Sequence, residues 1–118
     1  MNGAVTKQFP TRLCSDQVVT ILDAETTSNA ANLTGTSLVA IDIPAGLEGT
    51  SMTFEVSTDG VTYRQYRRLF DGVAVTAVVG ADGSYATLVT DFAGYNFIKL
   101  VTDTQTSDID FTLKTRPL

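Results

Sequence analysis

Much of this chain consists of short segments in which apolar and polar residues alternate, with Asp-Gly pairs close to several of them. A β-strand places successive side chains on opposite faces, so this alternation predicts strands that each bury one face. The clearest segments are 37–43, 51–57, 73–79, 96–102 and 109–115. Residues 17–23 and 84–90 predict two further strands with less regular alternation. No window has a sustained helical period, so we expect an all-β protein.

The alternation also predicts the core. The expected inward side chains are Val39, Ile41, Ile43, Met52, Phe54, Val56, Val73, Val75, Ala77, Val79, Ile98, Leu100, Ile109, Phe111 and Leu113. Asp59-Gly60, Asp71-Gly72 and Asp82-Gly83 predict tight turns, because glycine adopts positive φ at little cost. Seven or eight short strands joined by such turns predict an antiparallel β-sandwich or jelly roll.

A chain of 118 residues suits one domain. We expect an N-terminal arm over 1–16, with Phe9 in contact with a neighbouring subunit, and a β-sandwich domain over 17–118. The polar connection 24–36 is long for a compact domain, which leaves two interpretations: a mobile surface loop or a segment that contacts a partner. The sequence shows neither a signal-peptide core nor the run of about 18 apolar residues of a membrane helix, so we expect no membrane partner.

The absence of histidine excludes several kinds of chemistry. Serine–histidine and cysteine–histidine nucleophile pairs and the commonest general base are all removed. One cysteine, Cys14, cannot form an internal disulfide or a thiolate metal site, and we expect either a buried thiol or an intermolecular disulfide. A net charge of −5 disfavours nucleic acid as a partner.

The 13 acidic residues leave two further possibilities, a carboxylate-based glycosidase and a calcium site. Most of these residues stand in predicted turns, where carboxylates accept hydrogen bonds from local backbone N–H groups. Asp103, Asp108 and Asp110 are close in sequence, but their spacing departs from that of a calcium loop. We therefore expect no enzyme activity, no catalytic residue, no metal and no cofactor.

The stretch that follows the Asp59-Gly60 turn has no clean apolar face, which predicts an edge strand or a projection beyond the core. Tyrosine and arginine are enriched at interface hot spots. Three interpretations stay open: a solvated edge whose arginines deter aggregation, a protein interface, or contact with a polyanion or glycan. The candidate interface residues are Phe9, Tyr63, Arg64, Tyr66, Arg67 and Arg68.

Three pieces of the chain resemble a group of small tailed-bacteriophage virion proteins. They are MTFEVSTDGVTYR at 52–64, FDG at 70–72 and DFAGYNFIKLVTDTQTSDIDFTLKTRP at 91–117. The resemblance implies a β-sandwich structural protein made in the host cytoplasm. It also implies a capsid decoration (cement) protein on the capsid surface, bound to the major capsid protein and often trimeric. Tail, collar and fibre components share similar sandwiches and form the first alternative.

A carbohydrate-binding module is the second alternative. Tyr63, Tyr66, Tyr85 or Tyr95 would then supply the aromatic platform on which a sugar stacks. The chain contains no tryptophan, which counts against this interpretation.

Overall fold

The computed structural model describes residues 14–88 and 91–117, and these residues form strands and loops without a helix. The strands are β1 Ser15–Ile21, β2 Ala31–Asn32, β3 Thr36–Ile43, β4 Ser51–Ser57, β5 Arg64–Gln65, β6 Ala77–Val78, β7 Gly83–Ala86, β8 Phe97–Val101 and β9 Ile109–Pro117. The predicted all-β antiparallel sandwich is confirmed. The expected count of seven or eight strands is too low, because the two-residue strand β2 lies in the connection 24–36, where no strand was predicted.

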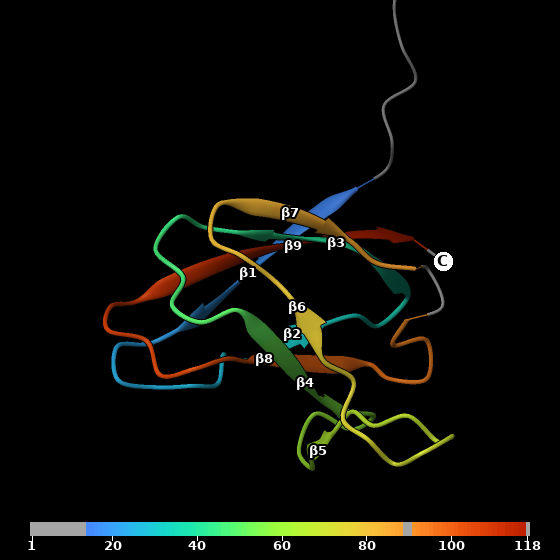
Figure 1. The fold of residues 1–118 in the computed structure, drawn as a ribbon. Coiled ribbons are helices and arrows are strands. Elements are labelled where there is room, and N and C mark those ends of the chain that lie inside the picture. The colour runs from blue at the N-terminus through green and yellow to red at the C-terminus, as the bar shows by residue number, and fades with distance from the viewer. Residues whose placement is uncertain (1–13, 89–90, 118) are drawn as a thin grey trace, which may run out of the picture.

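The strands form two antiparallel sheets stacked as two layers (Figure 1). One sheet has the order β1-β9-β3-β7, and the other has the order β2-β8-β4-β5 with β6 also paired to β4. Apart from β6, the pairing is nested: β1 pairs with β9, β2 with β8, β3 with β7 and β4 with β5. A nested set of antiparallel pairs distributed over two sheets is a jelly roll.

The core fills the space between the sheets. All the predicted inward residues of 51–57, 96–102 and 109–115 are buried, so the alternation identified these faces correctly. Phe111 and Leu113 of β9 face Ile98 and Leu100 of β8 across this core, and none of the four has measurable solvent exposure. Side chains of this kind contribute about 1.5–3 kcal/mol each when they leave water.

The predicted inward face of β3 is wrong at its first residue. A β-bulge pairs Leu38 with Thr115 and Ala40 with Lys114, which leaves Val39 as the extra residue. Such an insertion reverses the alternation within one strand. Leu38 is therefore buried and Val39 only partly so, while Ile41 is buried as predicted.

The predicted strand 73–79 is much shorter than expected. Only Ala77–Val78 pair with β4, and although Val79 is buried, Val73 is half exposed. The cause is a separate narrow hairpin, in which an isolated bridge joins Arg67 to Ala74. Val73 belongs to this hairpin and has no facing sheet to cover it.

The N-terminal boundary also differs from the expected one. β1 begins at Ser15 and pairs with Thr115 there, so residues 15 and 16 belong to the sandwich. Residues 1–13, including Phe9, lie outside the described residues. Cys14 is exposed directly before β1, so the buried-thiol interpretation is wrong.

The connection 24–36 forms part of the second sheet. The Ser28 N–H donates to the Leu100 carbonyl at 2.9 Å, and the Leu100 N–H donates to Ser28 Oγ at 2.9 Å. Ala31 and Leu33 in the same segment are buried. The expectation of a mobile surface loop is therefore replaced by a segment that hydrogen bonds and apolar burial hold in place.

Candidate interaction site

The predicted interface stretch, residues 63–68, includes β5, the last strand of the order β2-β8-β4-β5. Its two residues pair with β4 as Glu55–Gln65 and Val56–Arg64. The prediction of an edge strand is confirmed.

A hydrogen-bonded turn precedes β5. Asp59 Oδ1 accepts from the backbone N–H groups of Val61 at 2.8 Å and Thr62 at 2.9 Å, and from Ser57 Oγ at 2.9 Å. These bonds, with the two backbone donors foremost, lower the pKa of Asp59 to about 2. Gly60 has φ of 77°, as the predicted Asp-Gly turn requires. The Asp59 carboxylate is therefore engaged by its own turn.

Tyr63 is paired within the chain. The Lys99 ammonium lies 4.2 Å from the centre of the Tyr63 ring, within the range of a cation–π contact. Burial, and then the negative charge of Asp59, raise the pKa of the Tyr63 hydroxyl. One face of this ring is thus covered by a cation of the same molecule.

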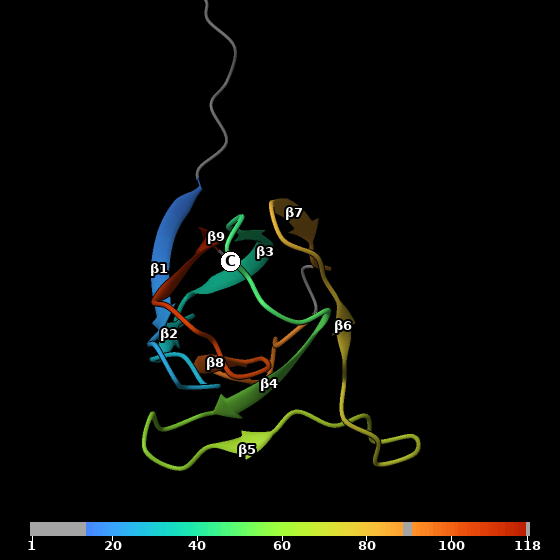
Figure 2. The ribbon, with the colours of Figure 1, turned by 60° about the vertical axis from the view of Figure 1, so that its left-hand side comes forward.

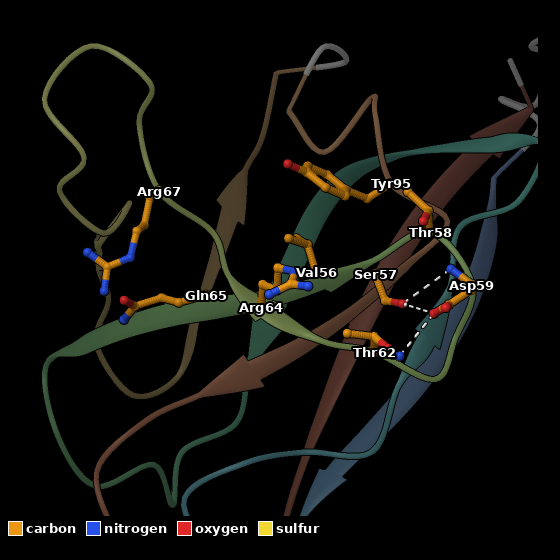
Figure 3. A pocket seen from close by; sticks show the side chains of 9 residues that line it. All are labelled: Val56, Ser57, Thr58, Asp59, Thr62, Arg64, Gln65, Arg67 and Tyr95. Carbon is orange, nitrogen blue, oxygen red and sulfur yellow. Dashed lines mark hydrogen bonds between the residues drawn. The ribbon is translucent and has the colours of Figure 1, made fainter.

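Arg64 and Arg67 line an open cleft of about 520 Å³. Figure 3 shows Gln65 and Arg67 at one end of the cleft and the Ser57–Asp59 turn at the other. The Arg67 guanidinium donates to the Gly72 carbonyl at 2.9 Å. The open shape and polar lining suit contact with another macromolecular surface better than enclosure of a small substrate.

Tyr66 anchors this stretch to the core. Its ring lies 4.9 Å from that of Phe92 and meets that of Tyr95 edge to face at 5.7 Å. Its backbone N–H donates to the Phe54 carbonyl at 2.8 Å, and its carbonyl accepts from the Val75 N–H at 3.0 Å. Among the predicted interface residues, Tyr66 therefore packs against the core and supports the stretch from behind.

Residues 66–75 form a narrow hairpin, called here the tip hairpin, which projects beyond the sandwich (Figure 2). The Arg68 N–H donates to the Val73 carbonyl at 2.9 Å, and the Gly72 N–H donates to the Arg68 carbonyl at 2.8 Å. Asp71 forms a salt bridge with Arg68 at 2.7 Å and accepts from the Val73 N–H at 2.9 Å. The Val73 N–H and then Arg68 lower the pKa of Asp71. The turn is thus fixed by both backbone and side-chain bonds.

The tip hairpin presents two large apolar side chains to solvent. Leu69 and Phe70, called here the apolar knob, are 102% and 96% exposed. The predicted edge strand or projection did not single out these two residues. The available signal was a pair of large apolar residues directly before an Asp-Gly turn, a position where polar residues are the rule.

A second cavity, called here the inter-sheet pocket, has a volume of about 380 Å³ and lies between the two sheets. Its lining is mainly apolar and includes Ile41, Met52, Phe54, Ala77, Tyr85 and Phe92. Arg68 and Asp91 are the charged residues in this lining. This pocket could not be predicted from local sequence patterns, because its walls come from six separate segments.

The four tyrosines considered for a sugar platform each have an intramolecular partner. The Tyr85 hydroxyl accepts a hydrogen bond from the Gly80 N–H at 2.7 Å, and the Lys99 ammonium lies over the Tyr63 ring. Tyr66 and Tyr95 meet at an interplanar angle of 78°, so their faces do not form one flat surface.

The carboxylates considered for calcium bind different neighbours. Asp108 accepts from the Asp23 N–H at 2.9 Å, and Asp110 accepts from the Thr20 hydroxyl at 2.6 Å. Within residues 14–88 and 91–117, no three acidic or cysteine side chains gather as metal ligands would. The same residues include no helix with the length and apolar character needed to cross a membrane.

The fold and the site define a jelly roll that carries a fixed, projecting hairpin with an exposed apolar knob. Comparisons with protein-family models, curated proteins and solved structures find no match to this chain.

Proposed function

We propose that this chain is a non-catalytic structural protein of a tailed-bacteriophage virion. It acts as a capsid decoration protein that binds the major capsid protein at the outer shell. The observation that carries this proposal is the apolar knob, because Leu69 and Phe70 are fully exposed on a hairpin fixed by hydrogen bonds. Burying such a pair against a partner contributes about 1.5–3 kcal/mol per side chain. Exposed apolar groups bordered by polar residues mark protein interaction sites.

The virion assignment is supported by the resemblance to small phage proteins. Its three pieces, 52–64, 70–72 and 91–117, fall on β4 with its turn, on the tip hairpin, and on β8 with β9. Jelly rolls are found in viral capsid proteins and also in lectins. The fold alone is compatible with both, so the proposal depends on the knob and the resemblance together.

The protein would work as a homo-oligomer, with a trimer favoured, on the capsid surface. Arg64, Arg67 and Arg68 are exposed on the stretch that precedes the knob, while the chain as a whole has a net charge of −5. Complementary charges of this kind steer association and fix orientation. Placement in the tail, collar or fibre is the alternative within the same class of virion proteins.

The test adds purified full-length chain to capsids that lack it and to isolated tails. We expect saturable binding to capsids at symmetric positions, seen as added density in cryo-electron microscopy. The variant Val61→Ser, which changes an exposed apolar residue outside the tip hairpin, should bind like the wild type. Binding only to tails would establish the alternative, and failure to bind either particle across a range of salt would refute the proposal.

A further inference from the structure

We infer that the apolar knob of one copy occupies the inter-sheet pocket of a second copy of this chain. The inference rests on the proposed function and deepens it: the knob holds the copies of the homo-oligomer together, and the oligomer so formed is what binds the capsid. It concerns the free protein, so it is testable in the absence of any capsid.

The knob cannot fill the pocket of its own chain. Arg68 lines the inter-sheet pocket, yet the next two residues, Leu69 and Phe70, are fully exposed. The bonds that close the turn, from Arg68 to Val73 and Asp71, hold the knob in that outward position. An apolar group and an apolar cavity thus lie close together on one molecule without meeting, and only a second molecule can bring them into contact.

The knob and the inter-sheet pocket are chemically complementary. The knob offers one aliphatic and one aromatic side chain, and the pocket of about 380 Å³ is lined mainly by apolar side chains. Phe54 and Phe92 in its wall already meet edge to face, with ring centres 5.0 Å apart and an angle of 66°. An entering Phe70 ring would extend this cluster in the geometry that aromatic pairs prefer.

The tip hairpin and the rest of the chain carry net charges of opposite sign. The tip hairpin carries Arg67 and Arg68 against one carboxylate, Asp71, which forms a salt bridge with Arg68, and this leaves six cations against 12 carboxylates in the rest of the chain. A cationic tip that approaches another copy therefore meets an acidic body. Asp91 in the lining of the pocket provides a carboxylate next to the entering hairpin.

The arrangement can close on itself. Because the tip hairpin contributes Arg68 to the pocket, knob and pocket are neighbours on the surface. In a dimer with a twofold axis, the knob of each copy could occupy the pocket of the other. In a cyclic ring, the knob of each copy could occupy the pocket of the next copy. Either arrangement buries every knob and fills every pocket.

The first experiment measures the mass of the full-length protein by sedimentation velocity over a range of concentrations. We expect concentration-dependent association of the wild type, and a loss of about tenfold or more in affinity for Leu69→Ser/Phe70→Ser. Ala86→Trp, which places a large ring at an exposed residue of the pocket lining, should have the same effect. The double variant Val18→Ser/Val61→Ser removes two exposed apolar side chains elsewhere and should associate like the wild type.

The second experiment uses cross-linking between chains that each carry one cysteine. Cys14→Ser removes the exposed native thiol, after which a Phe70→Cys chain is mixed with an Ala86→Cys chain. We expect the mixed disulfide dimer to exceed the one formed when Val61→Cys replaces Phe70→Cys. Equal yields of the mixed disulfide dimer would overturn the inference, because they would show that the knob does not bind preferentially at the pocket.

These results separate the two proposals. A wild type that stays monomeric at all concentrations, yet decorates capsids, would overturn the inference and leave the proposed function in place. Self-association that depends on the knob and the pocket, without binding to any virion particle, would support the inference and refute the proposed function. Association unaffected by both Leu69→Ser/Phe70→Ser and Ala86→Trp would assign the interface to another surface and overturn the inference.

Discussion

The side-chain amide of Gln105 binds Glu48 as a neighbouring strand would: its Oε1 accepts from the Glu48 N–H at 3.0 Å, and its Nε2 donates to the Glu48 carbonyl at 3.0 Å. The side chain of Gln105 is buried. Its backbone also donates to the Glu25 carbonyl at 3.0 Å and accepts from the Ala24 N–H at 2.8 Å. One residue therefore joins the loops β1–β2, β3–β4 and β8–β9 at one end of the jelly roll.

Replacement of Gln105 by leucine should destabilise the fold by about 1–3 kcal/mol, because the Glu48 N–H and carbonyl lose their partners while the volume is nearly kept. Urea denaturation monitored by circular dichroism gives the free energy of unfolding. Thr104→Ala, an exposed position one residue away, serves as the control and should change stability by less than about 0.5 kcal/mol. Equal stabilities for Gln105→Leu and the wild type would show that the three loops do not depend on this amide.

The bulge in β3 predicts opposite outcomes for two adjacent residues. Leu38→Ala should cost about 2–5 kcal/mol, because it leaves a cavity in the core. Val39→Ala should cost about 1 kcal/mol or less, since Val39 is the extra residue of the bulge and is partly exposed. The same denaturation measurement compares them, and a larger loss at Val39 would contradict the register in which Leu38 faces the core.

The sequence predicted the regular parts of the fold because alternation reports burial directly. In β4, Met52, Phe54 and Val56 were correctly predicted to face the core. This strand has paired strands on both sides and contains no bulge. The bulge at Val39 was not predictable, because one extra residue leaves no local mark in the pattern. Strand β2, with two residues, is too short for any period to show.

The candidate site was predicted only in part. The edge position and the exposure of Arg64, Arg67 and Arg68 followed from the lack of an apolar face. The supporting position of Tyr66 depends on Phe92, 26 residues away in the chain, and such long-range contacts are invisible to local patterns. The exposure of Leu69 was not predicted, because local alternation does not show where the chain turns back.

The turn around Asp59 predicts a specific acid sensitivity. The pKa of Asp59 is about 2 in the folded protein, below its ordinary value of 3.8, so the ionised form stabilises the folded state. This contribution is fully present above about pH 4 and is lost as the pH falls towards 2. Asp59→Asn should therefore be less stable than the wild type at neutral pH, and the difference should shrink over this interval.

Melting temperatures measured from pH 6 to pH 2 test this expectation. Asp82→Asn removes one negative charge from another turn, so it reports the effect of net charge alone. A difference between wild type and Asp59→Asn that stays constant down to pH 2 would show that the Asp59 hydrogen bonds are not formed in solution.

The fixed shape of the tip hairpin depends on Gly72, which has φ of 70°. A side chain in this left-handed conformation costs about 1–2 kcal/mol, so Gly72→Ala should open the turn between Arg68 and Val73. Trypsin cuts after arginine, and we expect cleavage after Arg67 and Arg68 to accelerate severalfold in the variant. Gly94→Ala is the matched control, because Gly94 is exposed, has no positive φ and has free space around it. If both variants are cut at the rate of the wild type, the hairpin does not rely on this turn, and the outward position of Leu69 must be maintained by other contacts.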